Sequence, residues 1–322
     1  MRRREFIWGA VMLGWPAASY AQTASHVIGF VNSASAEGYS SMADAFKEGL
    51  AAAGYREGAN VRIEYRWADN RYDRIPGLVT DVVARQVDVI VANGPVIAAV
   101  KAATSTIPIV FTSGEDPVRL GLVERLNRPG GNVTGAIVLS AEVGSKRLQL
   151  LHELLPQAKT IAVLVNLDFG PSGQFQADVE SAAKTLGLSV QFFPASTEVE
   201  VQRAFERLAE VRGEAILVGP GPFLDSRRNL LVALATKASI PAAYETRATA
   251  MAGGLISYGG RVSDMYRQAG VYAGRILNGD KPGELPVFLA TRLELVINLR
   301  TARSLGLDVP AAILARADEV IE

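Results

Sequence analysis

Several loops in the first half of the chain are short, polar and rich in small residues. Each follows an apolar segment, and together they contain six candidate ligand contacts: Ser33, Ser35, Asn93, Gly94, Ser113 and Gly114. Because these loops lead into segments with helical spacing, they would present hydroxyl groups and the backbone N–H groups of helix starts. That combination favours binding of a carboxylate or a similar anion. The two serines are equally well explained as turn and capping residues.

The corresponding loops of the second half carry larger side chains. They contain seven further candidate contacts: Asp168, Phe169, Pro222, Phe223, Tyr244, Arg247 and Tyr258. The aromatic rings would enclose a flat or apolar group, and the Arg247 guanidinium would hold a carboxylate through two parallel hydrogen bonds. Alternatively, Arg247 would only fix its own loop. These residue types indicate ligand binding.

The sequence lacks the usual signatures of catalysis. It has no cysteine and two histidines, which excludes disulfides and thiolate chemistry and leaves few general bases. Neither a glycine-rich nucleotide loop nor a GxSxG nucleophile turn is present. We therefore expect no catalytic residue, no cofactor and no metal site. The carboxylates near the expected cleft keep an exported α/β hydrolase or isomerase open as an alternative: Glu37, Glu115, Asp116, Asp168 and Glu245.

The composition limits which classes of protein the chain can belong to. With 322 residues, 49% of them hydrophobic, the chain is long enough for two domains of about 130–150 residues each. Its 33 basic and 33 acidic residues balance. This balance argues against nucleic-acid binding, which normally needs a basic excess.

Apolar segments alternate with segments of helical spacing throughout the chain. Strands are expected at 27–32, 61–65, 87–92 and 107–111, and again at 161–166, 188–193, 215–218 and 240–243. Helices are expected at 41–53, 72–85, 96–103, 174–186, 198–211 and 227–238, with a later helix at 263–277 and a strand at 293–299. Continuously apolar strands are typical of parallel sheets buried on both faces. The pattern predicts an α/β fold of doubly wound parallel sheets.

The pattern restarts halfway along the chain. Residues 87–92 resemble residues 213–218, and 50–55 resemble 182–188. We therefore predict two similar α/β lobes, each with its own sheet. Glycine-rich stretches at 128–132 and 258–261 fall where one lobe would pass to the other. Several crossings between lobes form a hinge that can close on a ligand.

The N-terminus resembles a secretory signal. Three arginines at 2–4 precede an apolar stretch, and the small residues Ser19 and Ala21 precede a cleavage site before Gln22. The apolar stretch is shorter than the ~20 residues of a membrane span. We expect residues 1–21 to direct export to the periplasm, and the pair Arg3–Arg4 is compatible with the twin-arginine route.

Several motifs resemble a family of bacterial ABC-transporter substrate-binding proteins, some of which take up tryptophan and many of which have unknown ligands. The resemblance covers essentially the whole mature chain, and its most specific parts are the stretch Leu126–Gly135 and the C-terminal octapeptide at 315–322. It implies the periplasmic binding protein type I fold, with a three-segment hinge. It also implies an N-lobe of residues 22–135 plus 259–288 and a C-lobe of residues 136–258 plus 289–322.

The function that this resemblance implies is capture of a small organic ligand for an ABC importer. The ligand is expected to be a carboxylate-bearing compound, such as an amino acid or an aromatic acid, enclosed by hinge closure and presented to a permease in the inner membrane. A monomer is expected. A periplasmic sensor module is an alternative that needs the same closed surface. In the loop at 244–249, Tyr244 and Arg247 match the family, whereas Thr246, Ala248 and Thr249 replace larger family residues, which predicts a roomier or more polar pocket.

Overall fold

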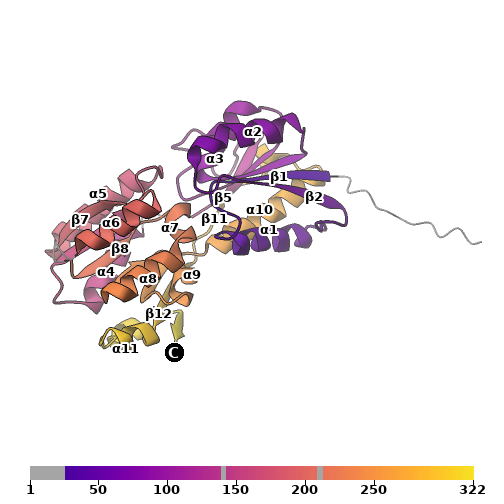
Figure 1. Cartoon of the computed structure of the whole chain (residues 1–322). Coiled ribbons are helices and arrows are strands. Elements are labelled where there is room, and N and C mark those ends of the chain that lie inside the picture. Colours follow the sequence, from indigo (N-terminus) through magenta and orange to yellow (C-terminus); the bar gives the residue numbers. More distant parts are fainter. Residues whose placement is uncertain (1–25, 139–142, 209–212) are drawn as a thin grey trace, which may run out of the picture.

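The computed structural model describes residues 26–138, 143–208 and 213–322, which form two α/β lobes side by side (Figure 1). The expected signal at 1–21 and the end of the helix expected at 198–211 lie outside the described residues. Among the described helices, none combines the length and the hydropathy that crossing a membrane requires.

The N-lobe is built on a parallel sheet of six strands in the order β11-β5-β4-β3-β1-β2. Its strands are β1 His26–Asn32, β2 Val61–Trp67, β3 Val89–Asn93, β4 Ile109–Ser113, β5 Val133–Ile137 and β11 Phe288–Leu289. Its helices are α1 Ser40–Ala52, α2 Ile75–Ala84, α3 Gly94–Ala103 and α10 Val262–Leu277, with short 3₁₀ turns at Tyr72–Arg74 and Pro282–Glu284. The α1–α10 side and the α2–α3 side each bury their own apolar cluster, so both faces of the sheet are covered.

The C-lobe has a sheet of seven strands in the order β13-β12-β10-β9-β8-β6-β7. Its strands are β6 Thr160–Val165, β7 Ser189–Pro194, β8 Ala215–Val218, β9 Ala242–Tyr244, β10 Ile256–Gly260, β12 Leu293–Asn298 and β13 Glu319–Ile321. Its helices are α4 Gly144–Leu154, α5 Ser172–Leu186, α6 Glu198–Leu208, α7 Pro222–Ser226, α8 Arg228–Ala238, α9 Arg247–Met251, α11 Leu299–Ser304 and α12 Ala311–Leu314. The pairing of β12 with β10 is antiparallel, so this sheet is mostly rather than wholly parallel.

The two lobes repeat one topology, as the internal similarity predicts. The strand order β2-β1-β3-β4-β5 of the N-lobe corresponds to β7-β6-β8-β9-β10 of the C-lobe. The similar sequences at 87–92 and 213–218 include most of β3 and all of β8, which occupy equivalent places in the two sheets. In both lobes the carboxyl ends of the central strands therefore meet at one edge, where α/β proteins bind ligands.

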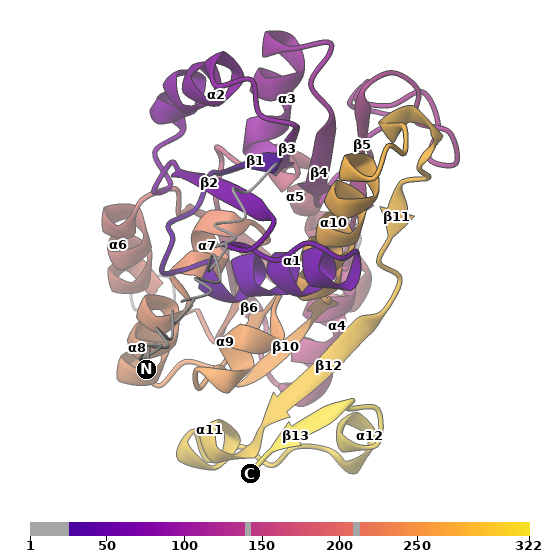
Figure 2. The same ribbon diagram turned by 90° about the vertical axis from the view of Figure 1, so that its right-hand side faces the viewer.

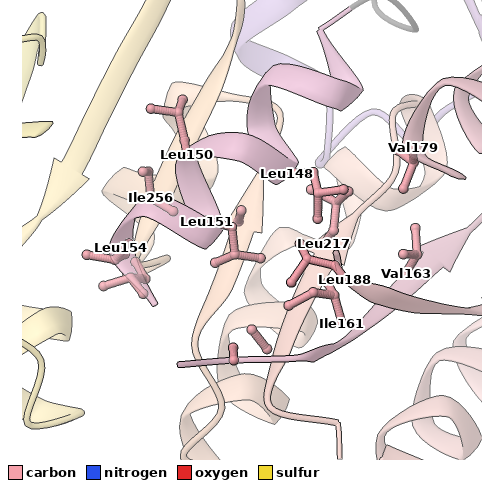
Figure 3. Packing of buried hydrophobic residues seen from close by; sticks show 14 of the residues in the cluster. Leu148, Leu150, Leu151, Leu154, Ile161, Val163, Val179, Leu188, Leu217 and Ile256 are labelled. Carbon is pink, nitrogen blue, oxygen red and sulfur yellow. The ribbon is translucent and has the colours of Figure 1, made fainter. Parts of the chain in front are cut away.

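The lobes are held rigid by cores on both faces of each sheet. In the C-lobe, leucines of α4 interlock with branched side chains of β6 and β8 (Figure 3). Leu148 and Leu151 of α4 are fully buried there, as are Ile161 and Leu217 of the sheet. This packing fixes the ends of the strands, and therefore the positions from which the loops start.

Two glycines allow α10 to pack on the N-lobe after the chain has passed through most of the C-lobe. A side chain at Gly49 of α1 would overlap the backbone carbonyl of Arg267, and one at Gly270 of α10 would overlap the carbonyl of Phe46. The two helix backbones are therefore in direct contact, and they lie alongside each other in Figure 2. This contact ties the second crossing of the chain to the first lobe.

The chain passes between the lobes three times. The first passage follows β5, the second lies at Arg261 between β10 and α10, and the third follows β11. The glycine-rich stretches precede or end strands that the sequence pattern did not predict, β5 and β10. The structure accordingly places all of Val133–Ile137 in the N-lobe sheet and all of Ile256–Gly260 in the C-lobe sheet, two residues beyond the expected boundaries at 135 and 258.

Candidate functional site

A cavity lies between the two lobes, at the carboxyl ends of their central strands. The N-lobe contributes Tyr39, Asn93, Gly94, Thr112, Ser113, Gly114, Val138, Val262, Met265 and Tyr266. The C-lobe contributes Phe169, Gly221, Pro222, Asp225, Glu245 and Thr246. A ligand in this cavity would contact both lobes, which is the condition for closure to be driven by binding.

The start of helix α3 forms one wall of the cavity. Asn93, at the end of β3, uses its side chain to accept from the backbone N–H of Ser33 and to donate to the Ser33 hydroxyl, both at 2.9 Å. It therefore does not cap α3. The first N–H groups of a helix have no acceptor within the helix and carry its positive end. Gly94 brings that end to the cavity surface without a side chain in the way.

Hydroxyl groups and aromatic rings complete the N-lobe wall. Ser113 ends β4, and its hydroxyl accepts from the N–H of Glu115 at 3.0 Å, which leaves its own proton to donate. Tyr266 of α10 accepts from Asn32 at 2.9 Å, and its ring meets that of Tyr39 edge to face at 6.1 Å. Burial raises the pKa of Tyr266 to about 12, so this hydroxyl stays protonated.

Phe169 supplies the apolar surface of the C-lobe wall. It follows β6 and is 6% exposed. A side chain at Gly221 would meet the ring at 3.0 Å, and one at Gly94 of the opposite lobe would meet it at 3.9 Å. Gly221 has φ +130°, a conformation that a residue with a side chain rarely adopts. The ring thus lies between the lobes, beside the start of α3.

Asp225 of α7 is an acidic group in the cavity wall with a side chain only one-tenth exposed. It accepts a 2.6 Å hydrogen bond from the Thr246 hydroxyl, and its other oxygen lies 3.8 Å from Arg228. Burial raises the pKa of Asp225, and the bond from Thr246 and the charge of Arg228 oppose that rise. A cation that entered the cavity would replace the water that this carboxylate has lost.

Glu245, after β9, is the second carboxylate of the cavity. It accepts from the N–H of Gly221 at 3.3 Å. Behind the wall, Arg147 is buried over the ring of Phe175, donates to the carbonyl of Val218 at 3.1 Å and interacts electrostatically with Glu245. Burial lowers the pKa of Arg147, while the charge of Glu245 opposes this shift.

The cavity is therefore electrically polarised. Across the described residues, the charged side chains that line it are Asp225 and Glu245, both from the C-lobe, and no Lys, Arg or His side chain lines it. The N-lobe opposes them with a helix start and hydroxyl groups. A molecule with a cationic group, an anionic group and an apolar body would match all three features.

Six of the thirteen residues expected from the sequence line this cavity: Asn93, Gly94, Ser113, Gly114, Phe169 and Pro222. The structure places the other seven away from it. Ser33 is buried against Asn93, and the Ser35 hydroxyl accepts from the N–H of Gly38, so both serve as turn residues. Asp168 is exposed at the surface, on the loop after β6.

The remaining four expected contacts serve the C-lobe itself. Phe223 and Tyr244 are 4% and 2% exposed in the core between the sheet and α6–α8. Tyr258 packs on the core of the opposite face. Arg247 is exposed and forms a two-bonded ion pair with Glu319, at 2.5 and 2.8 Å, which is the loop-fixing alternative.

Five residues that line the cavity were absent from the expected contacts: Asp225, Tyr39, Tyr266, Val262 and Met265. Thr246 was noted only as a smaller residue in the loop at 244–249. Glu245 was noted only as a carboxylate near the cleft. Asp225 carried a usable signal, because it lies three residues after Pro222 and so on the same face of a helix. Tyr266 carried none, because α10 reaches the cavity only through the second passage between the lobes.

Comparisons with known proteins agree with this arrangement. The model of the family described as ABC transporter substrate binding protein matches residues 27–321. A tyrosine-binding protein of Clostridioides difficile is 29% identical over 265 residues, which cover 81% of this chain and 75% of that protein. Proteins of this family are typically extracytoplasmic.

Two solved structures allow the arrangement of the lobes to be compared. An ABC domain from Streptococcus pneumonia in complex with L-Trp superposes with a TM-score of 0.82 at 25% identity, covering 92% of this chain and 99% of that one. The ligand-free, open structure of a substrate binding protein with adhesive properties from Clostridium difficile has the same identity and coverage but a TM-score of 0.62. The lobes of this chain are therefore arranged more like those of the ligand complex.

The fold is the periplasmic binding protein type I fold of these neighbours, as the sequence resemblance implied. Both the family and the fold are those of proteins that bind solutes, not of enzymes. The match over 27–321 and a cavity between two lobes lead to one conclusion: this chain belongs to the ABC transporter substrate binding protein family.

Proposed function

We propose that the protein is the periplasmic receptor of an ABC importer and that its ligand is an α-amino acid with an aromatic or large apolar side chain. Its ammonium group would bind at Asp225, with Glu245 nearby. Its carboxylate would bind at the start of α3 and at Ser113. Its side chain would lie against Phe169 and the tyrosines of the N-lobe.

The observation that carries this proposal is the opposition of charge across the cavity. Two carboxylates stand on the C-lobe, and an uncapped helix start stands on the N-lobe. A carboxylate ligand without an amine would bring a third negative charge to Asp225 and Glu245, with no cationic side chain among the described residues of the wall. An α-amino acid carries both charges on groups bonded to one carbon atom and would offer one charge to each wall.

Two relatives support the same ligand class. The related structure holds L-Trp, and the curated relative is a tyrosine-binding protein. Both of those ligands are aromatic α-amino acids.

The experiment is a set of matched compounds measured by thermal unfolding and isothermal titration calorimetry. L-tryptophan and L-tyrosine are each compared with the amine that lacks the carboxylate, tryptamine or tyramine. They are also compared with the acid that lacks the amine, indole-3-propionate or 3-(4-hydroxyphenyl)propionate. A ligand present at about a hundred times its Kd stabilises the folded state by about 2.7 kcal/mol.

We expect a saturable shift with an amino acid and a loss of most of it with either truncated compound. Retention of the shift by the deaminated acids would contradict the ammonium site at Asp225. A saturable shift with a sugar and with none of the amino acids would contradict the ligand class as a whole.

Import and location need tests in cells. We propose that residues 1–21 are removed on export and that the protein acts as a monomer with a hinge formed by the three passages between lobes. N-terminal sequencing of protein from the periplasmic fraction should begin at Gln22. Deletion of the gene should abolish uptake of the radiolabelled amino acid, whereas unchanged uptake would favour the sensor alternative.

A further inference from the structure

A second space between the lobes adjoins the candidate cavity. It has a volume of about 460 Å³ and is called here the hinge-side groove, because Arg261 of the second passage lines it. The first turns of α1 and α10 border it from the N-lobe, and α9, β10, β12 and β13 border it from the C-lobe. Figure 2 shows these elements, with α1 above and α9, β10 and β12 below. Its size is within the range of about 300–1,000 Å³ that is usual for small-molecule sites.

The groove and the cavity share part of their walls. Asp225, Thr246 and Val262 line both. Asp225 and Thr246 are joined by the 2.6 Å hydrogen bond described above. The carboxylate that we assign to the ligand ammonium group therefore stands at the boundary of the two spaces, and a cation on either side of that boundary can meet it.

The other charged groups of the groove are paired with one another. Arg247 is bonded to Glu319, and Arg261 is bonded to Glu294, whose side chain is 8% exposed. Each pair brings together one positive and one negative charge, so these four residues favour neither sign strongly. The hinge-side groove is therefore suited to a polar segment without a net charge, such as a peptide unit with a small side chain.

The two ends of the cavity differ in the room that they leave for a longer ligand. At the end assigned to the carboxylate, the Phe169 ring lies across the start of α3, where a side chain at Gly94 would meet it at 3.9 Å. At the end assigned to the ammonium group, Asp225 leads into the groove. A ligand can therefore be extended beyond its amino group but not beyond its carboxylate.

We propose that the protein also binds dipeptides whose C-terminal residue is the aromatic amino acid, with the N-terminal residue held in the hinge-side groove. This inference rests on the proposed function, because the C-terminal residue occupies the amino-acid site. Its carboxylate stays at the start of α3 and its ring stays at Phe169. The added residue moves the ammonium group by one residue length, about 3.6 Å. Asp225 still meets that group, because it lines the groove as well.

The groove is present while the lobes are in contact. Beside it, both terminal nitrogens of Arg228 in the C-lobe donate to the carbonyl of Gly38 in the N-lobe, each at 3.2 Å. Gly38 lies three residues before Ser41, which lines the groove, and Arg228 lies three residues after Asp225. A dipeptide that used this space would not need the lobes to stand further apart.

Isothermal titration calorimetry with two isomeric peptides tests the proposal. Glycyl-L-tryptophan should bind within about tenfold of L-tryptophan, because it keeps the same contacts and one more residue must be ordered. L-tryptophylglycine should bind about 100-fold more weakly than glycyl-L-tryptophan, because its carboxylate is moved away from the start of α3. N-acetyl-L-tryptophan enters the groove without an ammonium group and should show a similar loss. The corresponding tyrosine compounds are measured in parallel.

A variant that fills the groove provides the second part of the test. Ser41 is exposed at the start of α1 and lines the groove. Ser41→Trp should weaken glycyl-L-tryptophan at least about tenfold, because the indole competes for the same space. Its affinity for L-tryptophan should be that of the parent protein, which also shows that the variant is folded. Ser40, exposed on the same turn, is not among the described residues of the groove, so Ser40→Trp is the matched control and should change neither affinity.

The outcomes distinguish this inference from the proposed function. If L-tryptophan or L-tyrosine binds and the glycyl peptides do not, the amino-acid site stands and the groove proposal is overturned. Equal affinity of glycyl-L-tryptophan for the parent protein and Ser41→Trp, or equal binding of the two isomeric peptides, also overturns it. If the glycyl peptides bind, lose affinity in Ser41→Trp, and no free amino acid binds, the groove stands and the free amino acid is the wrong ligand.

Discussion

The two lobes begin their cavity loops in the same way. β1 ends at Asn32, whose side-chain oxygen accepts from the N–H of Ala34 at 2.9 Å. In the C-lobe, Asn166 follows β6, and its oxygen accepts from the N–H of Asp168 at 3.0 Å. Each lobe therefore turns the chain after its first strand with an asparagine that bonds two residues ahead.

Beyond these turns the lobes contribute opposite chemistry. After β3, Gly94 opens helix α3 at the cavity, whereas the equivalent connection after β8 leads to Asp225. After β4 the cavity residue is Gly114, and after β9 it is Glu245. The shared topology determines where each loop stands, and the side chains determine which sign of charge each lobe presents. The difference predicts which way round a zwitterion binds.

The largest expected effect comes from removing one of the two carboxylates of the C-lobe. Asp225→Asn keeps an acceptor for Thr246 but removes the negative charge offered to a ligand ammonium. We expect the affinity for L-tryptophan to fall about 100-fold, because a buried charged hydrogen bond loses one partner. Calorimetry measures it, with Glu198→Gln as the control on the surface of the same lobe. An unchanged affinity would place the ammonium elsewhere.

The next test removes the ring between the lobes. Phe169→Ala deletes the apolar surface beside Gly94 and Gly221. Burial of a large aromatic side chain is worth about 1.5–3 kcal/mol, so affinity should fall roughly 10- to 100-fold. Phe169→Leu, which keeps most of the apolar volume, should lose much less. If both variants bind like the parent, the ligand side chain does not lie on Phe169.

The N-lobe should be less sensitive to side-chain changes, because part of its contribution is backbone. Ser113→Ala removes one neutral hydrogen bond, worth about 0.5–1.5 kcal/mol, and should weaken binding about three- to tenfold. Ser304→Ala, whose hydroxyl bonds only within α11, is the control. If Ser113→Ala lost more affinity than Asp225→Asn in the same titration, the N-lobe would be the lobe more sensitive to side-chain changes, contrary to this prediction.

We also expect the Asp225 carboxylate, which would bind the ligand, to lower the free energy of unfolding at neutral pH. Because burial raises its pKa, the folded protein holds this proton more tightly than the unfolded chain does. Its stabilising contribution is therefore present in acid and is lost as the pH rises through the raised pKa. At neutral pH, Asp225→Asn should raise the unfolding midpoint, by roughly 2–4 °C per kcal/mol regained. Calorimetric scans at pH 4 and pH 7 should show the gain only at pH 7.

The smallest effect is expected outside the cavity. Arg247→Met breaks an exposed pair with Glu319, and exposed pairs contribute about 0–1 kcal/mol. Affinity for L-tryptophan should stay within twofold, and the unfolding midpoint should fall slightly. A tenfold loss of affinity would indicate that Arg247 contacts the ligand, so that the C-lobe also contributes a cationic side chain to the site.

Much of the fold was predictable because strands buried on both faces leave a strong apolar pattern. β8 was expected at 215–218 and lies at Ala215–Val218, and α8 differs from expectation by one residue. β5 and β10 were missed because glycines interrupt their pattern: Gly135 in β5 and Gly259 in β10. Side chains at these glycines would overlap the carbonyls of Phe111 and Glu245. Close backbone packing, which a single sequence does not display, explains both.

The candidate site was predicted unevenly for a related reason. The loops after β3 and β4 reach the cavity as expected, because the carboxyl ends of parallel strands meet at one edge. The aromatic residues Phe223 and Tyr244 instead turn into the core, although their neighbours Pro222 and Glu245 line the cavity. Successive residues of a strand or helix point in different directions, and a shift of one position moves a side chain from the cavity to the core.

The sequence by itself determined the two α/β lobes, the repetition of their elements and the loops from which a ligand is held. Those features follow from local patterns of apolar and turn residues. Only the tertiary structure decided that Asp225 and Glu245 charge one wall, that Tyr266 arrives from α10, and that Arg228 meets Gly38 of the other lobe. The physical reason is that these contacts join residues far apart in the chain. They exist only after helix packing and three crossings have set the two lobes face to face.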